Sequence, residues 1–90
     1  MKINIEYCVI WDYEPRARSL REDLISTFKD EFNILDIKLI EGGRGVFEVS
    51  VNKGLKVFSK KKTGRFPISS IEVSQAIRDA ITDGRLWQES

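Results

Sequence analysis

The stretch IEYCVIWDYEPRA, residues 5–17, contains the chain's single cysteine, Cys8, at the point where a strand pattern passes into a helix pattern. Before Cys8, residues 3–7 alternate between apolar and polar side chains, which predicts a strand with one buried face. After it, Pro15 suits the first turn of a helix, because its missing N–H would have no partner within the helix there. A strand-to-helix turn is a usual place for a Cys-x-x-Cys redox pair, but the position three after Cys8 holds Trp11.

The rest of the chain shows one helix pattern, three strand patterns and a second helix pattern. Apolar residues recur at three- and four-residue steps after the first turn and predict an amphipathic helix that runs to about Phe32. Three alternating segments then predict strands, with apolar positions at Leu35, Ile37 and Leu39, at Phe47, Val49 and Val51, and at Leu55 and Val57. Residues 52–54, Asn-Lys-Gly, predict a three-residue hairpin between the last two strands. Ser69 and Glu72 predict a capping box at the start of the second helix, and Gly84 its end.

This order of elements predicts the fold class. Strand-helix-strand-strand-strand-helix gives a two-layer α/β domain with a four-stranded mixed sheet, both helices on one face and the other face open to water. The first two strands are expected to be parallel through a right-handed crossover, which is the minimal thioredoxin-like topology. We expect one domain over residues 1–90, with a core at about 2–83 and a short tail at 84–90. Trp87, in that tail, is expected to be exposed or to fold back onto the sheet.

Composition excludes several kinds of chemistry. Without histidine and with one cysteine, the chain cannot form a Ser/His/Asp triad, a Cys/His pair or a Cys/His zinc site, and we expect no metal or cofactor. A formal net charge of +1 gives no general reason to expect nucleic acid or an anionic membrane as partner. The N-terminal residues enter a strand pattern rather than a signal peptide, and no apolar run approaches a membrane span. We therefore expect a cytoplasmic protein, in agreement with the lack of an internal disulfide.

The chain resembles the selenoprotein W-like proteins, also called the Rdx family. The resemblance rests on five short segments in the right order and spacing, which are YC at 7–8, RA at 16–17, GVFEV at 45–49, SKKK at 59–62 and GRFP at 64–67. It implies a thioredoxin-like fold and a Cys-x-x-Cys or Cys-x-x-selenocysteine motif. Cys8 matches the first redox residue of that motif, whereas Trp11 replaces the second.

Two hypotheses follow for Cys8. In the first, Cys8 is a reactive single thiol that forms mixed disulfides with glutathione or with a thiol-containing protein, because it lacks a resolving partner for a dithiol cycle. It would then be partly accessible, with its pKa lowered by the N-terminus of the following helix. In the second, Cys8 is a small buried hydrophobe.

Three neighbours are candidates for a pocket or partner surface beside this thiol. Trp11 is either an exposed contact residue or a side chain that packs on the start of the helix. Phe66 and Pro67, in GRFP, either border Cys8 or end the last strand. The glycine-rich residues 41–45 precede a strand rather than a helix, and we expect them to be a flexible connection rather than a phosphate loop.

A basic segment supports an alternative function. Between Glu48 and Glu72 the chain has no acidic residue and six basic ones, which are Lys53, Lys56, Lys60, Lys61, Lys62 and Arg65. Strand alternation predicts that Lys56, Phe58 and Lys60 share the open face of the sheet. A basic face with an aromatic ring can bind RNA, and a basic face also suits an acidic protein. The competing interpretation is a solvated strand edge on which lysines prevent unwanted pairing.

Overall fold

The computed structural model describes residues 1–84; Trp87 lies outside the described residues. Its elements follow the predicted order with one addition, a short helix after the last strand. They are β1 (Lys2–Cys8), α1 (Glu14–Phe28), β2 (Asp36–Gly42), β3 (Phe47–Val51), β4 (Leu55–Ser59), α2 (Lys60–Thr63) and α3 (Ser70–Thr82). No helix in this part of the chain has the length and apolar character that crossing a membrane requires.

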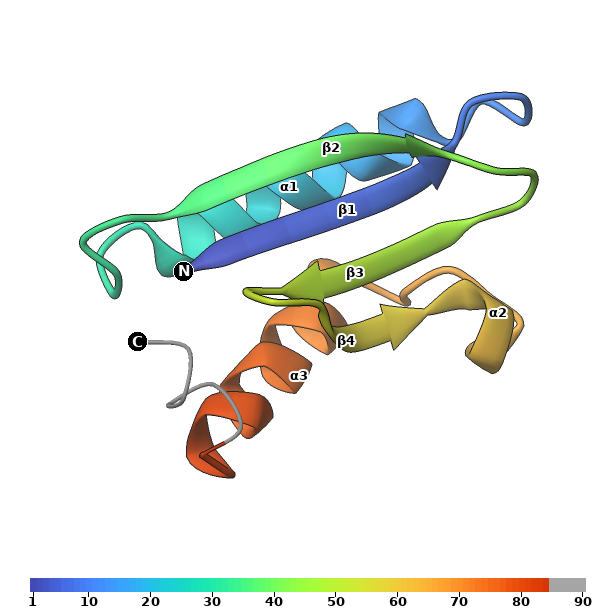
Figure 1. The fold of residues 1–90 in the computed structure, drawn as a ribbon. Coiled ribbons are helices and arrows are strands. Elements are labelled where there is room, and N and C mark those ends of the chain that lie inside the picture. The colour runs from blue at the N-terminus through green and yellow to red at the C-terminus, as the bar shows by residue number, and fades with distance from the viewer. Residues whose placement is uncertain (85–90) are drawn as a thin grey trace.

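The four strands form one mixed sheet in the order β2-β1-β3-β4 (Figure 1). β1 pairs with β2 in parallel, whereas the β1–β3 and β3–β4 pairs are antiparallel. Residues 52–54 form the predicted hairpin loop, and the N–H of Gly54 donates to the carbonyl of Val51 at 3.1 Å. The predicted α/β class and thioredoxin-like strand order are confirmed.

The hydrophobic core lies between the sheet and the two long helices. Each of these elements supplies its apolar side, including Ile3, Ile5 and Tyr7 from β1, Ala17, Leu20, Leu24 and Phe28 from α1, Phe47, Val49 and Val51 from β3, and Val73, Ile77 and Ala80 from α3. The side chain of Phe28 is fully buried, and its ring centroid lies 5.6 Å from that of Phe32. Phe32 therefore packs against the core, but α1 ends at Phe28 and does not reach Phe32 as the sequence predicted. Lys29 caps the helix, and its N–H donates to the carbonyl of Ile25.

The prediction for β4 was wrong in one respect. A register shift separates the pair Val49–Phe58 from the pair Ser50–Lys56, so Val57 is an extra residue on β4. Such a bulge changes the alternation of side chains along a strand. Phe58 consequently faces the core and is buried, with its ring centroid 6.5 Å from that of Phe47, instead of lying with Lys56 on the open face.

The segment after β4 also departs from a regular strand. Residues 60–63 form the helical turn α2, and the hydroxyl of Ser59 accepts a hydrogen bond from the N–H of Lys62 at 3.2 Å. Lys60 therefore belongs to α2 rather than to the last strand. At α3, Ser69 is the predicted N-cap, but its hydroxyl accepts from the N–H of Ile71.

Candidate functional site

Cys8 ends β1 on the face of the sheet opposite to the helices. Tyr7 belongs to the core cluster, and successive strand residues point to opposite faces. The chain then turns sharply: the N–H of Tyr13 donates to the carbonyl of Cys8 at 3.0 Å, and the N–H of Asp12 donates to the carbonyl of Val9 at 3.0 Å. Asp12 takes a left-handed conformation with φ 57°. Residues 9–12 are thus held as a hook at the end of β1, just before α1.

The cysteine is fully buried, with 0% of its surface exposed. The N–H of Trp11 donates to its Sγ atom at 3.3 Å, because the hook turns its backbone back over the strand end. This burial contradicts the partly accessible thiol of the first hypothesis and agrees with the small buried residue of the second. The backbone groups that contact the sulfur belong to two loops rather than to the helices of the core.

Two opposing effects act on the pKa of the Cys8 thiol. Burial raises the pKa, but hydrogen bonds from nearby backbone N–H groups together lower it by more than burial raises it. The pKa of the thiol therefore lies below its ordinary value. These groups belong to Gly45, Trp11, Ile10 and Val46. Backbone N–H donors favour the thiolate because they stabilise its negative charge. The direction agrees with the sequence expectation, but the donors belong to two loops instead of the start of α1.

The loop between β2 and β3 forms the other half of the cover. The N–H of Cys8 donates to the carbonyl of Val46 at 2.9 Å. Gly45 has a φ of +74°, and a Cβ at this position would lie 2.8 Å from Cζ3 of Trp11. Gly45 therefore lies directly against the indole of Trp11, a close contact that the sequence analysis did not predict. Gly45 and Val46 were not candidate site residues; only the glycine pattern hinted at a close approach.

Trp11 combines the two roles that the sequence left open. Its indole rests on Gly45 and meets the Tyr13 ring edge-on at 6.2 Å, yet 51% of the residue is exposed. The two residues before it, Val9 and Ile10, are 49% and 68% exposed. The hook thus presents three consecutive apolar side chains to solvent in the segment that follows the buried cysteine.

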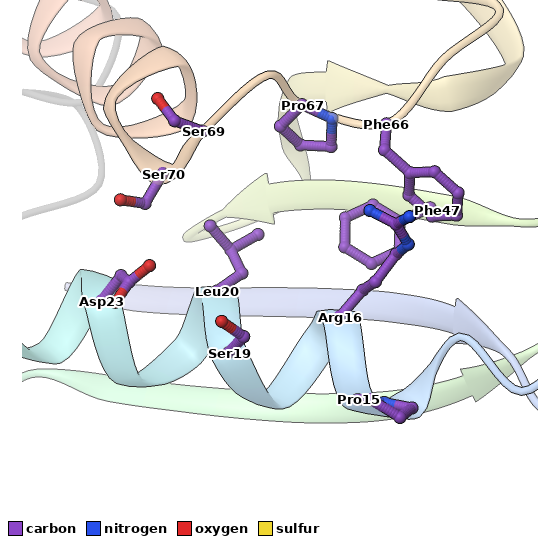
Figure 2. Close-up of a pocket in the computed structure, with 10 residues that line it drawn as sticks. All are labelled: Pro15, Arg16, Ser19, Leu20, Asp23, Phe47, Phe66, Pro67, Ser69 and Ser70. Atoms are coloured by element: carbon purple, nitrogen blue, oxygen red, sulfur yellow. The ribbon is translucent and has the colours of Figure 1, made fainter.

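GRFP lies at the end of the sheet that carries Cys8. The ring of Phe66 lies 4.6 Å from that of Tyr13 and 5.2 Å from that of Phe47, centroid to centroid. Phe66 and Pro67 also line a cavity of about 320 Å³ between α1 and residues 66–70 (Figure 2). Neither Cys8 nor Trp11 lines this cavity. Phe66 therefore contacts Tyr13, just after the hook, and neither Phe66 nor Pro67 lines a pocket together with Cys8.

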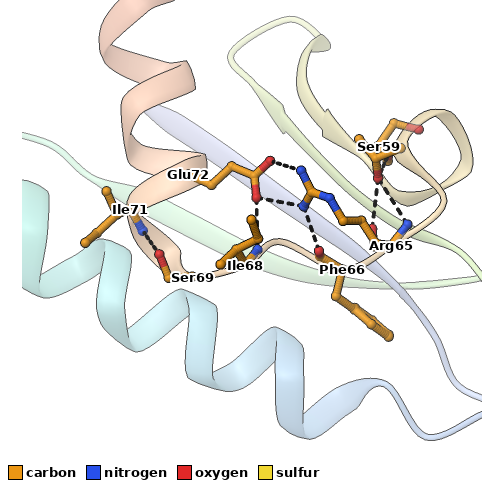
Figure 3. Close-up of polar contacts among 8 residues, drawn as sticks. Ser59, Arg65, Phe66, Ile68, Ser69, Ile71 and Glu72 are labelled. Atoms are coloured by element: carbon orange, nitrogen blue, oxygen red, sulfur yellow. Dashed lines mark hydrogen bonds and ion pairs between the residues drawn. The ribbon is translucent and has the colours of Figure 1, made fainter.

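The basic residues are divided rather than gathered on one face. The ammonium of Lys56 pairs with the nearly buried carboxylate of Glu48 at 2.9 Å. Arg65 forms two hydrogen bonds with Glu72, at 2.9 and 2.8 Å (Figure 3). Lys60 lies 5.3 Å from the ring centroid of Phe66. The remaining basic candidates include Lys61 and Lys62, which α2 carries.

The predicted capping box is not formed, because Glu72 accepts from the N–H of Ile68 instead of that of Ser69, and the Ser69 hydroxyl accepts from Ile71 instead of Glu72. Its carboxylate accepts from the guanidinium of Arg65 and from the N–H of Ile68 (Figure 3). Hydrogen bonds from Arg65 and then Ile68 lower the pKa of Glu72 to about 2. The carboxylate thus joins the GRFP segment to the start of α3.

The chain is similar to proteins of known family along most of its length. The Rdx family model matches residues 2–79. Proteins named migration and invasion enhancer 1 from Mus musculus and Bos taurus are 36% and 34% identical over 78 and 80 residues. Those matches cover 87% and 89% of this chain but 63% and 64% of the relatives, so the chain spans less than two thirds of their length.

Two solved structures show the same fold. A selenoprotein W-related protein from Vibrio cholerae superimposes with a TM-score of 0.78 at 30% identity, over 89% of this chain and 95% of that one. A Bordetella parapertussis protein gives a TM-score of 0.77 at 29% identity, over 87% and 94% of the two chains.

Fold and site together define a class: a thioredoxin-like domain with its cysteine at the end of the first strand, before the first helix. Within that class, the chain belongs to the Rdx family, as the resemblance in its sequence implied.

Proposed function

We propose that the protein is a thiol redox or thiol-dependent protein-interaction module that uses Cys8 alone to form mixed disulfides. The observation that carries this proposal is the set of backbone N–H groups around the Cys8 sulfur, which lowers the pKa of the thiol although the residue is buried. A sulfur that served only for packing would need no such donors. Family membership supports a redox-related role.

The reaction with oxidised glutathione needs one thiolate. The Cys8 thiolate attacks one sulfur of the glutathione disulfide, a bond forms between Cys8 and that sulfur, and the original disulfide bond breaks. The second glutathione leaves as a thiolate and takes a proton from water. Since Trp11 stands where a dithiol enzyme has its resolving cysteine, an external thiol must attack the mixed disulfide to regenerate Cys8. A protein disulfide would react in the same way.

The hook must open for this chemistry. Backbone groups of the hook and of residues 45–46 surround the sulfur, and three of the hook's side chains already face water. Local opening of such a segment costs less free energy than global unfolding. The exposed Val9, Ile10 and Trp11 also give a thiol-containing partner an apolar contact beside the sulfur.

The test is the reaction of the reduced protein with oxidised glutathione near neutral pH, followed by intact mass. We expect one glutathione per chain, removed by dithiothreitol, and no adduct in Cys8→Ser, which should remain folded. As a control, the same incubation with oxidised glutathione is carried out on the denatured chain, whose exposed thiol should form the adduct. A native protein that stays unmodified while the denatured chain is modified would refute the proposal.

The alternative, a domain that binds RNA or an acidic protein through its basic segment, has weaker support. Phe58, the aromatic ring expected among the lysines, is buried in the core. Lys56 and Arg65 are paired with carboxylates. Binding to a polyanion that falls steeply with salt, and that Lys60→Glu with Lys61→Glu abolishes, would favour this alternative over the thiol function.

A further inference from the structure

The cavity between α1 and residues 66–70 is lined by both apolar and polar side chains (Figure 2). The apolar ones are Pro15, Leu20, Phe47, Phe66 and Pro67. A volume of about 320 Å³ is near the lower limit of small-molecule pockets, which start at roughly 300 Å³. This space suits one large apolar side chain with the backbone on either side of it.

The two ends of the cavity carry opposite charges. Figure 2 shows Arg16 at the end beside Phe47 and Phe66, and Asp23 at the end beside Ser70. The guanidinium of Arg16 stacks on the Phe66 ring at 4.1 Å from its centroid, which leaves its N–H edge free to donate. Within residues 1–84, neither Arg16 nor Asp23 has an ion-pair partner.

We infer that this cavity binds an extended peptide segment of a partner protein, in which one apolar side chain lies between an acidic and a basic one. Arg16 and Asp23 are seven residues apart on α1, which corresponds to about 10 Å along the helix axis. In an extended peptide, the side chains at the first, third and fifth positions share a face, and the first and fifth are about 13 Å apart. The pattern acidic-x-apolar-x-basic, in either chain direction, therefore places its charges near both ends of the cavity.

The charges also exclude a different class of occupant. A polyanion such as RNA would meet the carboxylate of Asp23 at one end, and a strongly basic segment would meet Arg16 at the other. A mixed-charge segment satisfies both ends. The hydroxyls of Ser19 and Ser70, on opposite walls, offer hydrogen bonds to its backbone.

The test uses three capped synthetic peptides with a central leucine. Each peptide has a charged residue two positions before the leucine and another two positions after it. The mixed peptide carries one glutamate and one lysine there, the second peptide two glutamates, and the third two lysines. Binding is followed at low salt by the amide NMR shifts of Ser19, Leu20 and Ser70. We expect the mixed peptide to bind about two- to fivefold more tightly than either like-charged peptide, as for exposed ion pairs. Serine in place of the central leucine should weaken binding about tenfold or more.

Charge reversal at each end makes the test specific. Arg16→Glu should transfer the preference to the peptide with two lysines, and Asp23→Lys to the peptide with two glutamates. Arg18→Glu and Glu22→Lys make the same changes on the same helix outside the cavity, and they should keep the preference for the mixed peptide.

Two results would overturn the inference. One is the absence of shifts at the cavity residues with every peptide at millimolar concentration, with the amide spectrum showing a folded protein. The other is a change of preference in the two control variants as large as in the cavity variants. Cys8→Ser should leave all peptide affinities unchanged, so the result does not depend on whether Cys8 forms mixed disulfides.

Discussion

The indole of Trp11 rests directly on the backbone of Gly45, where an added Cβ would lie 2.8 Å from Cζ3 of the ring. The two residues belong to different loops, one after β1 and one between β2 and β3. The Cys8 sulfur accepts a hydrogen bond from the Trp11 N–H, and the N–H of Gly45 also acts on it. We therefore expect the contact between Trp11 and Gly45 to control access to the thiol.

Gly45→Ala should open this cover. Its Cβ displaces the indole, and the positive φ of +74° strains any L side chain, at a cost of about 1–2 kcal/mol. We expect Cys8 to react with an aromatic disulfide reagent several-fold faster than in the unmodified protein, measured as the rate of thiolate release.

Two other glycines provide matched controls for this variant. No atom lies within 4 Å of the position that a Cβ on Gly43 would take, and Gly43→Ala should change neither stability nor the reaction rate. Gly54 has a φ of +101° but no atoms near its Cβ position. Gly54→Ala should therefore destabilise the fold without increasing the reactivity of Cys8. Equal rates in the Gly45 and Gly54 variants would show that general destabilisation, and not the contact with Trp11, exposes the sulfur.

Phe28→Ala should destabilise the domain by about 3–5 kcal/mol, because it leaves a cavity at a fully buried position of α1. Urea denaturation followed by far-UV circular dichroism measures this change. Ile68→Ala removes an apolar side chain that is 83% exposed and should change the free energy of unfolding by less than about 0.5 kcal/mol. Equal effects of the two substitutions would contradict the burial of α1 against the sheet.

The core and the order of elements could be predicted because they depend on local periodicity. Ile5 lies on the apolar side of the first strand pattern, Leu24 and Ile77 lie at apolar positions of the two long helices, and each is fully buried. The bulge at Val57 could not be predicted, because a regular two-residue period was assumed through Phe58. One inserted residue moves every later side chain to the other face.

The candidate site was harder to predict for a different reason. The motif position of Cys8 was visible in the sequence, but its surroundings include Gly45 and Val46, which are more than thirty positions away. The same applies to the cavity beside Phe66, whose walls come from α1 and the start of α3. Such long-range contacts leave no local pattern in the sequence, apart from the glycines of residues 41–45.

The pair Arg65–Glu72 predicts a pH dependence of stability. The pKa of Glu72 is lowered to about 2 in the fold, so the carboxylate stabilises the native state at any pH above its unfolded value of about 4.3. That contribution should decrease as the pH falls from about 4.3 and should vanish near pH 2. The stability difference between the unmodified protein and Glu72→Gln, from urea denaturation, should follow this curve.

A double-mutant cycle identifies the partner. If Arg65 is the main cause of the lowered pKa, Arg65→Gln should reduce the free energy of unfolding at neutral pH by about as much as Glu72→Gln does. The double variant should then lose less than the sum of the two single losses. Strict additivity would mean that the N–H of Ile68, rather than the guanidinium, lowers the pKa of Glu72.

Trp11→Cys should restore an internal disulfide. The backbone nitrogen of Trp11 already lies 3.3 Å from the Cys8 Sγ atom, so residue 11 is close to the sulfur with which its new thiol would pair. Mild oxidation should lower the intact mass of the monomer by two hydrogens, and oxidised glutathione should yield the internal disulfide rather than a lasting adduct, since the new thiol resolves the mixed disulfide. Ile68→Cys, with its thiol on an exposed segment, should give adducts or dimers but no internal bond. A Trp11→Cys variant that behaves like Ile68→Cys would show that the hook does not hold residue 11 against the sulfur in solution.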